Sequence, residues 1–307
     1  MLNDVWFARQ PSTVSAYCYS LRKFFLFCRD LGFKLKLPVS AALAANYLSY
    51  LRNNLATKSA VSSAMNALKW LHNFVPGINV FNDPLNDKIV KMVYDSALRH
   101  CLKTKNQKRP LPATFIRKIS SSVSEVSSLV YVRDVTIICL AYNLLFRHDE
   151  VAHISCAHIS EVNGGYKFLI PFSKTDQYKD GNCTLLSEGR TLNLLKLYMT
   201  KAGLVLGEPK FLFGPMLRRK RESSIKNAQL SYTSYSALLR RFLVAECLEP
   251  KIYGFHSCRS GGASSPATKV TQFELMHCGR WKSSRFIAHY VGIPDNRKLQ
   301  FSRFLSH

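Results

Sequence analysis

The chain has 307 residues and a large excess of positive charge: 43 Lys and Arg stand against 19 acidic residues, a formal net charge of +24. Because such an excess repels itself, it favours a polyanionic partner, above all nucleic acid, over the substrates of an ordinary metabolic enzyme. A hydrophobic content of 47% argues against wholesale disorder. We find no apolar run of membrane-spanning length and expect no signal peptide, so we predict an intracellular protein without a membrane partner.

The first hundred residues predict a bundle of four short helices, because apolar side chains recur there at three- and four-residue steps. We place this helical DNA-binding domain at residues 1–101. The residues expected to open its helices are Ser12 or Thr13, Ser40, Thr57, and Asp83 with Pro84.

A basic segment with two prolines follows at residues 102–112, "LKTKNQKRPLPA" in its sequence context. Pro110 and Pro112 stop any helix there. We interpret the segment as a linker that lies on DNA phosphates, and the alternative is a solvated loop. Its basic residues are Lys103, Lys105, Lys108 and Arg109.

Residues 113–307 predict a second, mainly α domain with one small antiparallel β-sheet. "YVRDVTIICLAYNLLF" is apolar on most faces and predicts a central helix within 131–146. Asn163, Gly164 and Gly165 predict a hairpin turn, and a third short strand follows "SKTDQYKDG". The remaining expected helices are 113–123, 189–203, 231–247, 257–268, 271–278 and 283–290.

Nine cysteines occur without any C-x-x-C pair. Their odd number and mostly apolar surroundings indicate reduced cysteines of an intracellular protein. We therefore expect neither a disulfide framework nor a zinc or other metal site.

Six side chains along the second domain together fit phosphoryl transfer on DNA, although each taken alone has an ordinary structural explanation. Two arginines can stabilise the charge on the phosphate oxygens through bidentate hydrogen bonds. A tyrosine can form a covalent phosphoester, and a hairpin lysine can protonate the leaving oxygen. A histidine can exchange protons, and a tryptophan N–H can donate to the phosphate. In chain order these residues are Arg147, Lys174, His256, Arg259, Trp281 and Tyr290.

The order of these residues resembles the tyrosine recombinase family. The stretches "FSKTDQYKDG", "HSCRSGGAS" and "GRWKSSRFIAHYV" most resemble eukaryotic mobile-element members, the DIRS, Ngaro and Crypton-like recombinases. The resemblance covers nearly the whole chain and implies the DNA breaking-rejoining fold, with a helical core-binding domain, a linker and a catalytic domain at 113–307.

The resemblance also implies a role for each residue. Arg147 and Arg259 would clamp the phosphate, with Glu150 supporting Arg147. Lys174 would be the general acid, His256 would assist proton transfer, and Trp281 would fill a place that is His in many relatives. Tyr290 would be the nucleophile, leaving a 3′-phosphotyrosyl bond.

The family works without metal, ATP or any other cofactor, on double-stranded DNA, through dimers and a tetrameric synapse. In a eukaryotic host such an enzyme would act in the nucleus. Here Ser265-Pro266 interrupts the helix that usually follows the H-x-x-R box.

Two other readings stay open from the sequence: a type IB topoisomerase-like enzyme and a domesticated DNA-binding protein without catalysis. "LRRKRESSIK" at 217–226 fits a nuclear localisation signal, a phosphate-contacting loop or a plain basic surface. Besides the linker, the side chains that we expect to contact DNA are Lys58, Lys69, Arg280 and Lys282.

Overall fold

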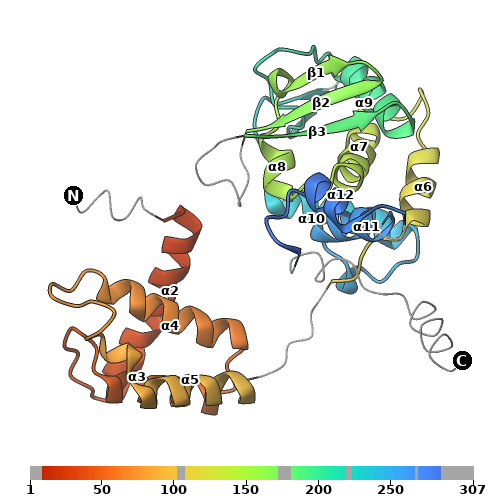
Figure 1. Cartoon of the computed structure of the whole chain (residues 1–307). Coiled ribbons are helices and arrows are strands. Elements are labelled where there is room, and N and C mark those ends of the chain that lie inside the picture. Colours follow the sequence, from red (N-terminus) through yellow and green to blue (C-terminus); the bar gives the residue numbers. More distant parts are fainter. Residues whose placement is uncertain (1–8, 102–107, 172–180, 219–222, 267–268, 285–307) are drawn as a thin grey trace, which may run out of the picture. The chain divides into compact units, whose positions relative to one another are not determined.

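The computed structural model describes residues 9–101, 108–171, 181–218, 223–266 and 269–284. The chain divides into two compact units, Met1–Lys105 and Asn106–His307, and each has its own hydrophobic core (Figure 1). Arg109 N–H donates to the Ile252 carbonyl at 2.8 Å and Leu111 N–H to the Ser257 carbonyl at 3.0 Å. The second half of the expected linker is therefore part of the second unit, and the boundaries 1–101, 102–112 and 113–307 stay a prediction.

The first unit is the predicted bundle of helices. Helix α2 packs on α4, and α3 packs on α5, around a core that includes Phe24, Tyr47 and Leu68. The helices are α2 (Pro11–Asp30), α3 (Ala41–Asn53), α4 (Lys58–His72), the 3-10 helix η1 (Pro84–Asn86) and α5 (Lys88–His100).

Two of the four expected helix starts in this unit are confirmed. Ser40 Oγ accepts the Leu43 N–H, and Thr57 Oγ1 accepts the Ala60 N–H. The start at Ser12 or Thr13 was wrong. Helix α2 begins at Pro11, because proline lacks the N–H that the first helical position would leave unpaired.

The fourth helix also begins later than predicted. Asp83 and Pro84 open only the short η1, and Asp87 caps α5 by accepting the Ile89 N–H.

The second unit is built around helix α7, in which every residue from Val132 to Tyr142 is buried, as the sequence predicted for a central helix. Helix α11 ends at Ser264, where Ser265-Pro266 was expected to interrupt it, and thus before residue 268. Apart from Ser283 and Ser284, the predicted helix 283–290 lies outside the described residues. The helices are α6 (Ala113–Ser121), α7 (Leu129–Asn143), α8 (His148–His153), η2 (Cys156–His158), α9 (Arg190–Ala202), α10 (Tyr232–Ala245), η3 (Pro250–Ile252), α11 (His256–Ser264) and α12 (Gln272–Gly279).

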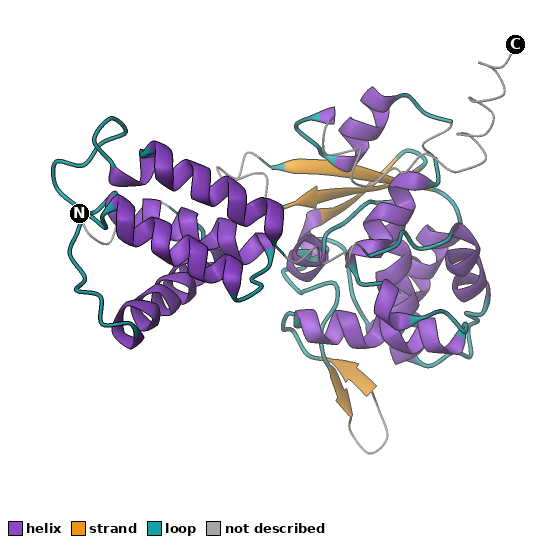
Figure 2. Ribbon diagram, turned by 90° about the horizontal axis from the view of Figure 1, so that it is seen from below, coloured by secondary structure: helices purple, strands orange, loops and turns teal. Residues whose placement is uncertain are grey.

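The predicted antiparallel sheet of three strands is present, in the order β1-β2-β3. Asn163 and Gly164 form the hairpin turn, with Val162 opposite Gly165 and Gly164 at φ 79°, which suits glycine. A second ribbon, β4-β5, was missed, because strands of three residues carry no readable alternation; Figure 2 shows it projecting from the helices. The strands are β1 (Ile159–Val162), β2 (Gly165–Ile170), β3 (Asn182–Ser187), β4 (Met216–Arg218) and β5 (Ser223–Ile225).

Two adjacent glycines let α11 approach its neighbours at backbone distance. A Cβ atom on Gly261 would lie 2.3 Å from the Leu111 carbonyl oxygen, and one on Gly262 would lie 2.0 Å from the Tyr142 carbonyl oxygen. Since α11 opens with "HSCR", these glycines set the distance between His256, Arg259 and the end of α7.

We predict that Gly262→Ala lowers the free energy of unfolding by about 3 kcal/mol, the upper part of the range for overpacked cores. The reason is that the new methyl group meets backbone, which cannot rotate away. Urea unfolding measures the effect. Asn193→Ala, on the exposed face of α9, is the control and should stay within about 0.5 kcal/mol of the wild type. Equal stability of Gly262→Ala and wild type would contradict the close packing.

Candidate functional site

The turn between α7 and α8 presents Arg147. Leu145 leaves α7 in a left-handed conformation, at φ 52°, and Arg147 is the N-cap of α8. The Glu150 side chain, in the first turn of α8, accepts the Arg147 backbone N–H at 2.9 Å and its guanidinium at 2.6 Å. These two contacts, both accepted by Glu150, resemble half of a capping box and fix the backbone and the side chain of Arg147.

Glu150 is the centre of a cluster of three arginines and is itself fully buried. Arg280 Nη2 lies 2.8 Å from Glu150 Oε2, and Arg259 Nη1 lies 3.9 Å from the same oxygen. Burial by itself would raise the pKa of the Glu150 carboxyl, but the charges of Arg280, Arg147 and Arg259 and the Arg147 N–H outweigh it and lower that pKa. The carboxylate is therefore ionised at neutral pH, and the cluster keeps an excess of positive charge.

Arg259 reaches the cluster from α11 and is fully buried. Its two terminal nitrogens donate to the carbonyls of Leu145 and Gly279, and its guanidinium lies 4.7 Å from the centre of the Trp281 ring. The Trp281 ring faces the Arg259 guanidinium, and the two carbonyls accept hydrogen bonds from its terminal nitrogens. The guanidinium is therefore held in one orientation.

Trp281 is also buried, in a small apolar cluster with Leu145, Ala263 and Leu275. A Cβ atom on Gly279 would lie 1.9 Å from the Trp281 ring, so only glycine fits beneath the indole. The sequence pattern "GRW" thus contains a packing requirement that the sequence analysis did not identify.

His256 stands at the first position of α11, with an exposed side chain. Loss of hydration and the nearby charges of Arg259, Arg147 and His148 lower its pKa. At neutral pH the imidazole is therefore in its neutral form, which can accept a proton as well as donate one.

The structure thus brings five of the predicted residues to one end of the second unit: Arg147, Glu150, His256, Arg259 and Trp281. Lys174 and Tyr290 lie outside the described residues. A set of two or three arginines beside a neutral histidine suits an anionic group that gains charge during reaction, such as a phosphodiester. In the described parts of the chain, no group of three His, Cys, Asp or Glu is arranged to hold a metal ion.

The expected DNA contacts stay predictions, and the structure shows which of these side chains are exposed. Lys58 and Lys69 are exposed on α4, a helix that has no acidic residue. Lys108 and Arg109 are exposed, although Lys108 Nζ donates to the Lys251 carbonyl at 2.5 Å. Lys282 is exposed, and Lys103 and Lys105 lie outside the described residues.

Arg280, which we expected to contact DNA, is buried in the structure. Only 5% of its side chain is exposed, and its guanidinium points inward to Glu150. Arg280 follows α12 in a left-handed conformation, at φ 55°, whereas Lys282, two residues further along, is exposed.

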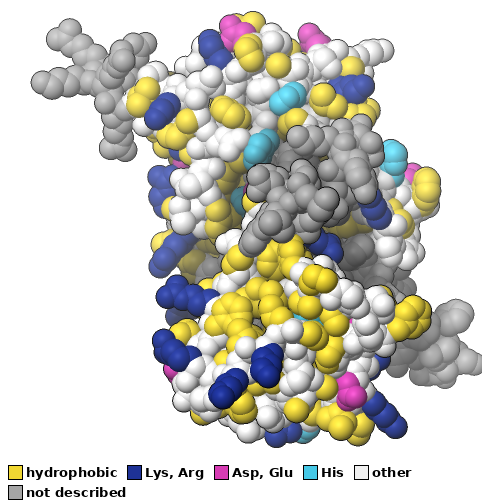
Figure 3. Space-filling model, turned by 90° about the vertical axis from the view of Figure 1, so that its left-hand side faces the viewer, with side chains coloured by type: hydrophobic (Ala, Val, Ile, Leu, Met, Phe, Trp, Pro, Cys, Tyr) yellow, Lys and Arg dark blue, Asp and Glu magenta, His cyan; other side chains and the backbone are white. Residues whose placement is uncertain are grey.

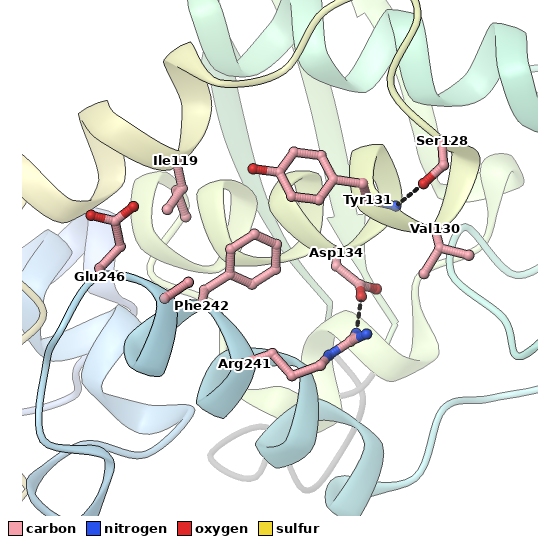
Figure 4. A pocket seen from close by; sticks show the side chains of 9 residues that line it. Ile119, Ser128, Val130, Tyr131, Asp134, Arg241, Phe242 and Glu246 are labelled. Carbon is pink, nitrogen blue, oxygen red and sulfur yellow. Dashed lines mark hydrogen bonds and ion pairs between the residues drawn. The ribbon is translucent and has the colours of Figure 1, made fainter.

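Two hollows in the described residues contain none of the predicted site residues. One, of about 340 Å³, lies between α6, α7 and α10, where Arg241 pairs with the buried Asp134 (Figure 4). The other, of about 710 Å³, lies in the first unit between α2, α3 and α4 and is lined by Tyr19, Tyr47 and Tyr50 among others. Figure 3 shows hydrophobic side chains gathered on one face of the first unit, in the lower part of the view, with Lys and Arg side chains around them.

Among the described helices, none combines the length and apolarity that crossing a bilayer requires.

The chain is similar in sequence to one curated protein over most of its length. An integrase/recombinase XerD homolog of Selenomonas ruminantium is 23% identical over 290 residues, which cover 92% of this chain and 82% of the relative. No family model matches the chain.

Solved structures show the same fold. The XerH site-specific recombinase in a post-cleavage complex with a palindromic difH substrate aligns with a TM-score of 0.68 at 16% identity, over 96% of this chain and 80% of that one. The Tn1549 transposon integrase bound to transposon right-end DNA aligns with a TM-score of 0.66 at 10% identity, over 97% and 95% of the two chains. The expected fold is confirmed by these alignments.

We predict that Glu150→Gln lowers the free energy of unfolding by about 3–5 kcal/mol at pH 7, as when one partner of a buried ion pair is removed. Because folding lowers the pKa of Glu150, its carboxylate contributes fully above the unfolded pKa of about 4.3 and loses this contribution as pH falls through the lower folded value. The difference between wild type and variant should therefore be constant from about pH 5 upward and shrink in more acid solution.

Urea unfolding at a series of pH values measures this difference. Glu161→Gln, at an exposed position on β1, is the matched control and should change little. If the deficit of Glu150→Gln did not depend on pH, the charge of the carboxylate would not be what holds the cluster.

Proposed function

We propose that this chain belongs to the tyrosine recombinase and integrase family, which its fold and its sequence similarity over most of its length support, and that it is a site-specific DNA recombinase. It cleaves and rejoins DNA through a covalent tyrosyl intermediate. The observation that carries the proposal is the arginine pair Arg147 and Arg259, held on one carboxylate beside Trp281 and His256. The Tn1549 transposon integrase has the same fold, which makes a mobile-element origin a reasonable part of the proposal.

The proposed reaction is a transesterification. The Tyr290 phenolate oxygen attacks the scissile phosphorus, a P–O bond forms, and the bond from phosphorus to the 5′ oxygen breaks. Lys174 gives a proton to the departing 5′ oxygen, which leaves a 5′-hydroxyl and a 3′-phosphotyrosyl bond. Rejoining is the same step in reverse. The phosphotyrosine retains the bond energy, so neither ATP nor a metal ion enters the scheme.

Arg147 and Arg259 are proposed to stabilise the charge that develops on the non-bridging oxygens, and Trp281 to cover the site. Because Arg259 is fully buried beside the Trp281 ring, its guanidinium must become accessible when DNA binds. His256, neutral at pH 7 because its pKa is lowered, is suited to relay the proton that leaves the tyrosine or enters at the 5′ oxygen.

The proposal also includes self-association of the chain on DNA. The XerH complex contains a palindromic substrate, and a palindrome offers two equivalent half-sites. We propose that this chain likewise acts as a dimer on each site and as a tetramer when two sites are joined. Mass determination of complexes on one and two sites tests both assemblies.

The affiliation with eukaryotic DIRS, Ngaro and Crypton-like elements rests on motif resemblance, and the relatives reported above include a bacterial protein and a transposon integrase. We propose this affiliation, together with action in the nucleus of a eukaryotic host. Inverted or split direct repeats around the gene test the affiliation. The basic stretch 217–226 spans the β4-β5 ribbon, and localisation of a fused reporter tests it as a nuclear signal.

We predict that a nicked suicide substrate traps a protein–DNA adduct and that peptide mapping places the adduct on Tyr290. Tyr290→Phe should abolish it, because phenylalanine has no oxygen to attack the phosphorus. Tyr253→Phe is the control and should still form the adduct. An adduct on another tyrosine, or an undiminished adduct in Tyr290→Phe, would overturn the assignment.

Assays with the same protein and its variants distinguish the two alternative functions. Relaxation of supercoiled plasmid without exchange between two sites would indicate a type IB topoisomerase-like enzyme. Binding without any nicking would indicate a DNA-binding protein that has lost catalysis.

We predict that DNA binding weakens steeply with salt, with a log–log slope of roughly −0.9 for each phosphate neutralised. Lys103→Ala with Lys105→Ala should flatten the slope, because these charges lie in the predicted linker. Lys88→Ala with Lys91→Ala, two exposed positions on α5, removes the same charge and should change the slope less. Titrations at several salt concentrations measure it, and equal slopes for the two double variants would remove the linker from the interface.

A further inference from the structure

Arg280 occupies a backbone position that normally favours glycine. It is the residue after α12, at φ 55°, and a non-glycine residue there costs on the order of 1 kcal/mol. The neighbouring Gly279 cannot be exchanged for a larger residue, because the Trp281 ring lies against it. Contacts of the Arg280 side chain can offset the free-energy cost of its own left-handed backbone conformation.

The guanidinium makes four hydrogen bonds to fixed acceptors. Nη1 donates to the carbonyls of Leu144 at 3.1 Å and Cys278 at 3.2 Å. Nη2 donates to the Leu145 carbonyl at 3.0 Å and to Glu150 Oε2 at 2.8 Å. Leu144 and Leu145 directly follow α7, where a helix leaves its last carbonyls without intrahelical partners. One side chain thus joins the end of α12 to the turn that carries Arg147.

Glu150 divides its two oxygens between the arginines. Oε1 accepts the Arg147 guanidinium, and Oε2 accepts both the Arg147 backbone N–H and Arg280. The charged groups that face the carboxylate are Arg280 from the end of α12, Arg147 from the turn and Arg259 from α11, and Arg280 lowers the Glu150 pKa most. Removing Arg280 would leave the carboxylate free to shift toward Arg147 or Arg259.

We propose that Arg280 is a positioning residue for DNA cleavage: it fixes Glu150, and through Glu150 the guanidinium of Arg147, relative to the segment that carries Trp281. The inference rests on the proposed recombinase function and extends it to a residue that would act through Glu150 rather than by contacting DNA. The four hydrogen bonds of its guanidinium to acceptors within the fold favour this role over the direct phosphate contact that a basic residue in "GRWK" suggests.

The test compares Arg280→Met, Arg280→Lys and the control Lys269→Met, which removes an exposed charge before α12. Single-turnover cleavage of the suicide substrate and DNA affinity are measured at a temperature where each protein is folded. We expect Arg280→Met to bind DNA like the wild type and to cleave about 10- to 100-fold more slowly, by analogy with the loss seen when a residue that orients a metal ligand is removed. Arg280→Lys should recover part of the rate, since it keeps the charge and loses the planar fork. Lys269→Met should cleave normally.

Two further measurements separate positioning from a general structural role. The cleavage rate should fall with acid at a higher pH in Arg280→Met than in wild type, because the Glu150 carboxylate has lost the cation that lowers its pKa most and takes up a proton more readily. In a double-mutant cycle with Glu150→Gln, the second substitution should add little to the first.

Additive effects of the two substitutions, or an unshifted pH profile in both Arg280 variants, would overturn the proposal. Weaker DNA binding with a normal cleavage rate would return Arg280 to the DNA interface. Absence of any adduct in the wild type would instead contradict the recombinase function itself.

Discussion

One buried carboxylate organises the functional end of the second unit. Glu150 is contacted by guanidinium groups from the α7–α8 turn, from α11 and from the residue after α12. Without the carboxylate these cations would repel one another where water cannot screen them, and without the cations the carboxylate would be a buried, unpaired charge. The carboxylate and the arginines therefore require each other. Their contacts fix segments more than a hundred residues apart in the chain at one place.

The backbone around this carboxylate is unusual in ways that follow from the cluster. Leu145 and Arg280 both have positive φ, and the Leu145 carbonyl accepts hydrogen bonds from Arg259 and Arg280. Gly262 and Gly279 let a backbone carbonyl and an indole approach more closely than any side chain allows. Strained conformations of this kind persist where surrounding contacts enforce them, and here those contacts are the ones that place the arginines.

Sequence patterns predicted the local features of this arrangement and missed the distant ones. Apolar periodicity located the helices, and the pairing of Arg147 with Glu150 follows from a spacing of three residues within one helical turn. The burial of Arg280 depends on a carboxylate 130 positions away, and no short window contains both residues. In "GRWK" the arginine is buried and the lysine is exposed, on either side of a tryptophan. A count of charged residues cannot distinguish the buried cation from the exposed one. The β4-β5 ribbon was missed because its strands are too short for alternation to be read.

The two kinds of positive charge in this protein have different physical roles. Exposed lysines such as Lys58 and Lys69 on α4 act through solvent, so their attraction for a polyanion is screened within about 10 Å at 0.1 M salt. The arginines on Glu150 are buried or half-buried and hydrogen-bonded within the fold, so salt screens them far less. Once Arg259 becomes accessible to a bound phosphate, they would already be oriented when charge develops on it. In the proposed function, the net charge of +24 would therefore govern how strongly DNA is bound, whereas the cluster on Glu150 would govern how fast a bound phosphate reacts. Arg280 is counted in the net charge, but because it is buried on Glu150 it belongs with the arginines of the cluster and not with the exposed lysines.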